Sequence, residues 1–137
     1  LFPRLIVNEA GVVTTDTIYR GRILRGSPLS AGDLAASFHN SLTILTAEVE
    51  GRSFGGGVLE LVPSEIARLL VPVSGRIGLE FDRLDWVTRT RGQFEDEALI
   101  DETDELVVKH VQGISARLMS TLREARENLL ARRLART

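Results

Sequence analysis

The chain has 137 residues, of which 43% are apolar, so it can bury one core and is not a disordered chain. It has no cysteine and only two well-separated histidines, which excludes a disulfide framework and a thiolate metal site, and we expect no metal site. The net charge of −2 argues against indiscriminate binding of nucleic acid, and no apolar run approaches the ~20 residues needed to cross a bilayer. We therefore expect a cytoplasmic protein without membrane contact.

Charge is distributed unevenly along the chain. Residues 1–30 carry a net charge of +2, residues 76–105 carry −6, and residues 109–137 carry +5. The acidic middle should not face phosphate. A phosphate-binding surface would use the first segment, Arg52 and the last helix.

The N-terminal segment predicts three strands. Residues 4–8 (RLIVN) and 12–14 (VVT) are β-branched and apolar and are separated by a glycine-containing turn, which predicts a hairpin. Residues 18–24 predict a third strand, in which Arg20 and Arg22 share one face and Tyr19 lies on the other. Gly26-Ser27-Pro28 ends this strand.

A long amphipathic helix follows. Ser30 and Asp33 have nearly the spacing and chemistry of a capping box. Apolar residues then recur at three- and four-residue spacing, and we expect them to face the core: Leu34, Phe38, Leu42, Leu45 and Val49. The pattern predicts one helix of about five turns, ended by Gly51 in a left-handed conformation.

The next elements are shorter. Gly55–Gly57 leads into a predicted strand over 58–62, and Pro63-Ser64-Glu65 begins a helix that must stop before Pro72. Residues 74–78 are the predicted joint to a helical tail, with helices over 81–90, from a Thr103 cap to Gly113, and from a Ser115 cap to about Ala135. In the last helix, Leu118, Leu122, Ala125, Leu129 and Leu134 are expected on the inner side.

The fold class predicted from these elements is α+β. A small antiparallel or mixed sheet packs with a long helix in residues 1–73, and residues 74–137 form a helical tail that packs on it as one domain.

The run from His39 to Glu65 reads HNSLT, AEVEGRSFGGGVLEL and PSE, and PRLIVN and VTTDTIY precede it. Together these motifs resemble the C-terminal, target-recognition region of adenine-specific (N6) DNA methyltransferases of restriction-modification systems. The resemblance covers roughly residues 3–72, and beyond Pro72 only a generic helical tail matches.

Such enzymes also carry two catalytic signatures, namely a glycine-containing loop for S-adenosylmethionine and an Asp/Asn-Pro-Pro-aromatic motif. Neither occurs here, because the four prolines stand apart and the glycine run precedes a strand rather than a helix. We therefore expect the C-terminal piece of a longer enzyme. It would hold no catalytic residue and no cofactor, and the parent enzyme would bind S-adenosylmethionine.

The loop of Arg52, Ser53, Phe54, Gly55, Gly56 and Gly57 is the sharpest candidate site. Glycine backbone allows close approach of a DNA phosphate, to which the Arg52 guanidinium and the Ser53 hydroxyl could donate. The alternative is a tight structural turn in which Arg52 pairs with Glu48 or Glu60.

Other candidates are weaker. Thr15, Tyr19, Arg20 and Arg22 suit base and phosphate contacts but also an ordinary solvated strand. His39 and Asn40 lie inside the predicted helix, where Asn is unfavourable unless its amide finds a partner, so they could contact DNA or serve as structural hydrogen-bonding groups.

The acidic residues and the arginines of the last helix also have non-functional interpretations. The carboxylates Glu48/Glu50 and Asp101/Glu102/Asp104/Glu105 are expected to form solvated faces. The arginines of the last helix could bind nucleic acid, or form a solvated basic side on a helix that packs on a partner.

The preferred hypothesis is a DNA-recognition and positioning fragment of an S-adenosylmethionine-dependent adenine-N6 DNA methyltransferase. Its expected partners are double-stranded DNA and the catalytic domain of the same polypeptide. The alternative is a protein-interaction or dimerisation module, with a homodimer as one form, in a restriction-modification complex. An independent enzyme is disfavoured, because no nucleophile–base pair or metal set stands out in the sequence.

Overall fold

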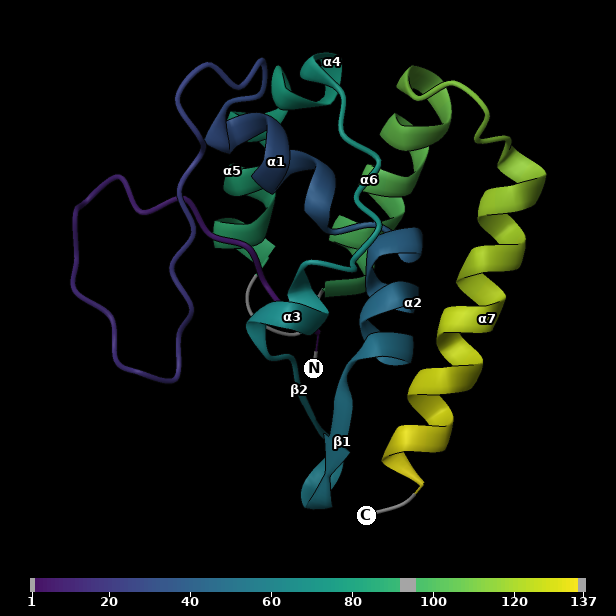
Figure 1. Cartoon of the computed structure of the whole chain (residues 1–137). Helices are drawn as coiled ribbons and strands as arrows, with labels where there is room; N and C mark the ends of the chain where they lie inside the picture. The colour runs from purple at the N-terminus through teal and green to yellow at the C-terminus, as the bar shows by residue number, and fades with distance from the viewer. Residues whose placement is uncertain (1, 92–95, 136–137) are drawn as a thin grey trace.

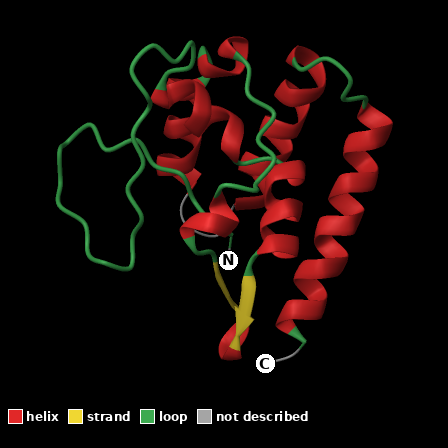
Figure 2. Cartoon of the chain, in the orientation of Figure 1, coloured by secondary structure: helices red, strands yellow, loops and turns green. Residues whose placement is uncertain are grey.

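The computed structural model describes residues 2–91 and 96–135. It contains a body of packed helices with a small antiparallel hairpin that extends from one edge of it, which confirms the α+β class (Figures 1 and 2). The elements are α1 (Ala31–Phe38), α2 (Ser41–Glu50), β1 (Arg52–Phe54), the 3-10 turn η1 (Gly55–Gly57), β2 (Val58–Glu60), α3 (Pro63–Ile66), α4 (Gly75–Gly78), α5 (Phe81–Arg91), α6 (Asp96–His110) and α7 (Ala116–Leu134). No helix among these described segments is long and apolar enough to span a bilayer.

Residues 2–29 form an open arm, which we call the N-terminal arm. It runs outward from the body and returns to α1 in a wide loop (Figure 1). The three strands predicted here are wrong, because no strand among the described residues pairs with this segment and a strand needs a partner for its backbone groups. The predicted turn exists, but the Asn8 side chain closes it through two hydrogen bonds to the backbone of Val12 (2.8 and 3.0 Å).

The single long helix predicted over 30–51 is two helices. The capping box is confirmed, since Ser30 Oγ accepts from Asp33 N (3.0 Å) and Asp33 Oδ2 accepts from Ser30 N (2.7 Å). The break falls at Asn40, whose side chain caps α2 by accepting from Thr43 N (3.0 Å). A side chain that competes for backbone hydrogen bonds favours a helix start over a helix interior, which explains the break.

The break changes which residues reach the core. Phe38 is buried as predicted, but Leu34, Leu42 and Leu45 are only partly buried and Val49 is exposed. The positions buried along α2 are instead Ser41, Thr43, Ile44 and Ala47. A periodicity counted through residue 40 fails because the two helices do not share one axis.

The hairpin joins β1 and β2, with Phe54 opposite Val58 in register. The predicted strand over 58–62 is confirmed for 58–60, while β1 was expected to be loop. Gly51 does not adopt a left-handed conformation, since its φ is −78°. Glycine is needed there for space: a Cβ would lie 2.8 Å from the Ala47 carbonyl oxygen and 2.8 Å from Leu59 Cδ1.

The tail follows the prediction with two changes. The predicted joint contains α4, and α6 begins before Thr103, whose buried hydroxyl donates to the Leu99 carbonyl one turn back (2.8 Å). Helices α5 and α7 lie where predicted, and Ser115 caps α7 by accepting from Leu118 N (3.2 Å).

Both halves of the chain contribute to one core. Its buried side chains come from α1, α4, α5, α6 and α7: Ala36, Ile77, Leu84, Leu99, Val107 and Met119. Helix α7 lies along α2 (Figure 1). Leu118 and Leu134, which were expected inside, are exposed, because Met119, Arg126 and Arg133 occupy the inner face.

Candidate nucleic-acid interface

The hairpin presents the predicted loop residues in two environments. Ser53, Phe54, Gly55 and Gly56 are exposed, and Phe54 remains 50% exposed beside Val58. Gly57 is buried, and its carbonyl oxygen accepts a hydrogen bond from Arg133 Nη1. One side of the hairpin tip therefore faces solvent, and the other faces α7.

Arg52 has an internal partner. Its Nε donates to Glu65 Oε1 (2.9 Å), and Glu65 Oε2 accepts from the backbone N of Val62 (2.9 Å). The expected pairing with Glu48 or Glu60 is wrong, because the start of α3 brings Glu65 to the base of the hairpin. The Val62 N–H, and then the Arg52 guanidinium, lower the pKa of Glu65 from its ordinary value, although desolvation opposes them.

The N-terminal arm carries a second group of predicted residues. Tyr19, Arg20 and Arg22 are all exposed, and the Thr15 hydroxyl shares a 2.8 Å hydrogen bond with the Thr17 hydroxyl. Arg25, three positions after Arg22, is exposed as well and extends the basic series. Sequence reasoning placed Arg25 outside the predicted strand and so passed over it, although its spacing from Arg22 was a usable signal.

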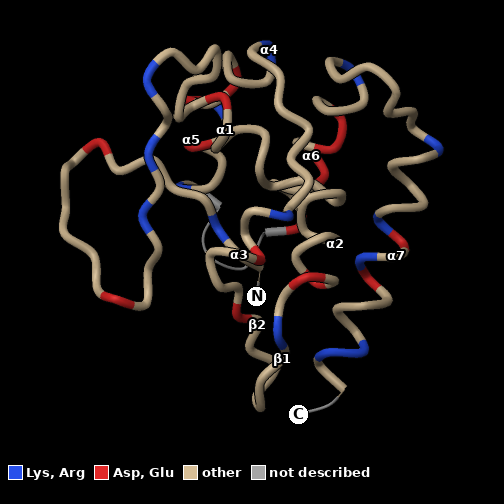
Figure 3. Tube along the Cα trace, in the orientation of Figure 1, with Lys and Arg blue, Asp and Glu red and all other residues tan. Residues whose placement is uncertain are grey.

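The arginines of the described residues differ in whether they pair with a carboxylate. Seven body arginines pair with carboxylates, in the pairs Arg52–Glu65, Arg68–Glu50, Arg83–Glu102, Arg89–Asp85, Arg123–Asp104, Arg126–Glu97 and Arg133–Glu48. Within the described ranges, Arg20, Arg22 and Arg25 of the arm form no such pair, and neither do the exposed body arginines Arg76, Arg117 and Arg132. Basic residues recur along the part of the arm that returns to α1 (Figure 3).

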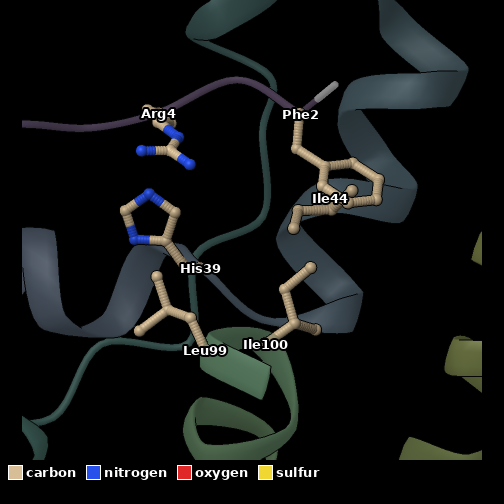
Figure 4. Close-up of a pocket in the computed structure, with 6 residues that line it drawn as sticks. All are labelled: Phe2, Arg4, His39, Ile44, Leu99 and Ile100. Atoms are coloured by element: carbon tan, nitrogen blue, oxygen red, sulfur yellow. The ribbon is translucent and has the colours of Figure 1, made fainter. Parts of the chain in front are cut away.

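His39 and Asn40 lie in the body of the fold. Asn40 is fully buried, and its amide nitrogen donates to the Ser37 carbonyl (2.6 Å) and to Thr43 Oγ1 (2.9 Å). The His39 ring packs edge-on against Phe38, with 5.4 Å between ring centroids. It also lines a small cavity with Phe2, Arg4 and Ile44 (Figure 4). That cavity offers about 10 Å³, room for about one water molecule rather than for a ligand.

The carboxylates expected on solvated faces include buried ones. Asp104 is 1% exposed and binds the start of α2, and the Glu48 side chain is buried against Arg133. For these two the expectation is wrong, because each meets a guanidinium from α7. Across residues 2–91 and 96–135, no cluster of three or more histidine or acidic side chains could hold a metal ion.

The arginines of α7 divide by face. Arg126 and Arg133 are buried, Arg123 is partly buried, and Arg117 and Arg132 are exposed. The helix therefore uses much of its positive charge inside the fold. Acidic side chains of α2 and α6 lie opposite this inner face, which explains why arginines can be buried there.

A comparison with family models matches residues 1–108 to the type II methyltransferase M.Eco57I, C-terminal domain. The chain belongs to this family. The match confirms the resemblance to a restriction-modification methyltransferase and identifies the chain as a methyltransferase C-terminal domain. It includes the N-terminal arm and the hairpin, and it ends within α6, so α7 lies outside it. No curated protein and no solved structure matches the chain.

Proposed function

We propose that this methyltransferase C-terminal domain positions double-stranded DNA for an adenine-N6 methyltransferase that uses S-adenosylmethionine. The family supports a methyltransferase, and the resemblance of the HNSLT and GRSFGGG segments supports adenine as the target base. The cofactor and the catalytic residues would belong to the catalytic domain of the parent enzyme, which would act in the cytoplasm. In this proposal residues 1–73 carry recognition, and residues 74–137 pack on them as one unit.

The observation that supports the proposal most directly is the cluster of exposed arginines on the arm. Arg20, Arg22 and Arg25 are exposed within six residues, without a carboxylate partner among the described residues. Guanidinium groups make charge-assisted, often bidentate, hydrogen bonds to phosphate oxygens. An extended, exposed segment with three such groups fits contact with several phosphates of one strand.

The hairpin would supply a second contact. The exposed Phe54 and Ser53 offer an apolar surface and a hydroxyl, while the open backbone at Gly55 and Gly56 permits close approach to a duplex. Because Arg52 already pairs with Glu65, we assign the main phosphate contacts to the arm rather than to Arg52.

The test is a triple substitution of Arg20, Arg22 and Arg25 to Gln in the full-length methyltransferase. Each lost phosphate contact reduces the slope of log K against log salt by about 0.9, so we expect a reduction of about 2 to 3. The matched control replaces three other exposed arginines, Arg76, Arg117 and Arg132, with Gln. Binding is measured by fluorescence anisotropy with duplex DNA over a salt series. A slope unchanged in the arm variant, or lowered equally in the control, rejects the arm as the phosphate-binding element.

A second function has one observation in its favour. The arm exposes seven large apolar residues, among them Val13 at 91% and Leu24 at 81%, and exposed apolar patches often mark contact surfaces between proteins. In that function the arm docks on the catalytic domain or on a second copy. Replacing Val13 and Leu24 with Ser would then loosen the assembly, measured by solution mass and limited proteolysis, while leaving the salt slope unchanged.

A further inference from the structure

A buried ion pair joins the C-terminal end of α2 to the C-terminal end of α7, which packs along it. Arg133 Nε donates to Glu48 Oε2 (2.9 Å) and Arg133 Nη2 donates to Glu48 Oε1 (2.7 Å), so the contact is bidentate. Both side chains are almost completely buried. A charge pair in this state is strongly constrained, because removal of either partner leaves a buried charge without compensation.

The same guanidinium also reaches the hairpin. Arg133 Nη1 donates to the backbone carbonyl of Gly57, at the end of the glycine turn. Gly57 has φ = 72°, in the left-handed region that favours glycine, and Gly56 before it has φ = 80°. One side chain on the last turn of α7 therefore holds α2 and the hairpin tip together.

The hairpin has few other restraints at its tip. Each strand has three residues, and an isolated two-stranded hairpin is marginal in water. At its base, the hairpin is held by the Arg52–Glu65 ion pair and by Leu59 against Gly51. At its tip, Phe54 and Val58 are exposed, and the hydrogen bond from Arg133 to the Gly57 carbonyl links the tip to the body.

We propose that Arg133 is a positioning residue that fixes the hairpin tip, so that α7 sets how the GRSFGGG hairpin is presented. Helix α7 lies outside the matched family segment, whereas Glu48 and Gly57 lie inside it. The link to DNA rests on the proposed function, while the link between α7 and the tip does not.

The first measurement is hydrogen exchange of the backbone amides of the 137-residue chain. In Arg133→Met we expect the amides of residues 52–60 to exchange at least about ten-fold faster. The control, Arg132→Met, changes the exposed neighbour on the same turn and should leave them unchanged. Because Arg133→Met leaves the buried Glu48 carboxylate without its partner and so destabilises the fold, a second variant combines Arg133→Met with Glu48→Met.

The double variant distinguishes an effect on the hairpin tip from an effect on the stability of the whole fold. Two apolar side chains can replace a buried ion pair without loss of stability, but neither can donate to the Gly57 carbonyl. We therefore expect the melting temperature to recover while the backbone amides of the hairpin tip still exchange faster than in the unmodified chain. Unchanged tip exchange in the double variant, or acceleration spread equally over α5 and α6, would overturn the positioning role.

DNA binding is measured with the same double substitution in the full-length methyltransferase. A several-fold loss of affinity, together with fast tip exchange, supports both the positioning role and the hairpin contact. Unchanged affinity with fast tip exchange upholds the positioning role and removes the hairpin from the DNA interface. The two failures are therefore distinguishable.

Discussion

Asp104 on α6 caps the first residue of α2 from a distance of 63 positions in the sequence. Its two carboxylate oxygens accept from the backbone N of Ser41 (2.7 Å) and from Ser41 Oγ (2.7 Å). Arg123 on α7 donates to the same carboxylate (3.0 Å). A negative charge at a helix N-terminus satisfies free N–H groups and the helix dipole, so Asp104 joins three helices at one point.

We expect Asp104→Ala to lower the free energy of unfolding by about 2–4 kcal/mol, because it removes the cap of α2 and leaves the buried backbone N–H and hydroxyl of Ser41 without their acceptor. The control is Asp101→Ala, which loses a contact to the same Arg123 (3.1 Å) but from a carboxylate with 53% of its side chain exposed. An exposed pair contributes about 0–1 kcal/mol. Urea denaturation of both variants measures the difference, and equal losses would contradict the special role of Asp104.

Helix ends were predictable where a local capping pattern sets them. Ser30 with Asp33 and Ser115 each begin a helix where the sequence indicates, because their hydrogen-bonding partners lie within three residues. Asn40 is unfavourable inside a helix and so signals the break, but the apolar period continues across it and predicts a single helix.

Long-range partners were not predictable in this way. Arg133 meets Glu48 across 85 positions, and Glu65 reaches Arg52 only because α3 packs beside the hairpin. A periodic pattern cannot identify which carboxylate a particular arginine will meet. The arm failed for another reason: its sequence has β-type alternation, but no strand in the described part of the chain pairs with it.

The candidate site could be predicted by segment rather than by contact. The sequence singled out both the arm and the GRSFGGG loop, and both are exposed in the fold. It could not indicate that Arg52 is paired while Arg20 and Arg22 have no carboxylate partner within the described chain. That distinction depends on packing, and it is the reason why we assign the main phosphate contacts to the arm and not to Arg52 of the hairpin.

Asn40 provides a test of the structural role of the HNSLT segment. We expect Asn40→Ala to cost about 2–3 kcal/mol, because it removes the α2 cap and leaves the buried Ser37 carbonyl without the amide donor. The control is Asn8→Ala, which loses two side-chain hydrogen bonds to the backbone, but on the exposed arm. A surface change of that kind should stay within about 0.5 kcal/mol. Thermal unfolding of both variants is the measurement, and a near-neutral Asn40→Ala would refute the capping role.

Ionisation of Glu65 should make the stability of the fold depend on pH in the acidic range. Its pKa is lowered in the folded chain by the Val62 N–H and by Arg52, so on acidification the unfolded chain takes up this proton first. The stabilisation is complete above the pKa of the unfolded chain, near 4.3, and is lost as the pH falls through the lower pKa of the folded chain.

We therefore expect Glu65→Gln to lower the melting temperature at about pH 6 and to have little effect once both states are protonated. Arg52→Gln should keep part of this pH dependence, because the Val62 N–H, which is the largest single cause of the lowered pKa, is retained. Melting curves recorded from pH 6 downward check both variants. A destabilisation by Glu65→Gln that is independent of pH would show that packing, not ionisation, sets its effect.

Gly51 and Gly55 flank β1 and make a matched pair, because only one of them is crowded. A Cβ at Gly51 would lie 2.8 Å from the Ala47 carbonyl oxygen and 3.1 Å from the Glu60 carbonyl oxygen, and backbone atoms on both sides cannot move independently. Overpacking of this kind costs about 1–3 kcal/mol, so Gly51→Ala should lower the free energy of unfolding by that amount. Gly55 has open space around the same position and a φ outside the left-handed region, so Gly55→Ala should be close to neutral. Urea denaturation compares the two directly. If both variants were equally stable, the close approach of the α2 end to β2 would not restrain the hairpin base, and the Arg52–Glu65 pair would be left to hold that base.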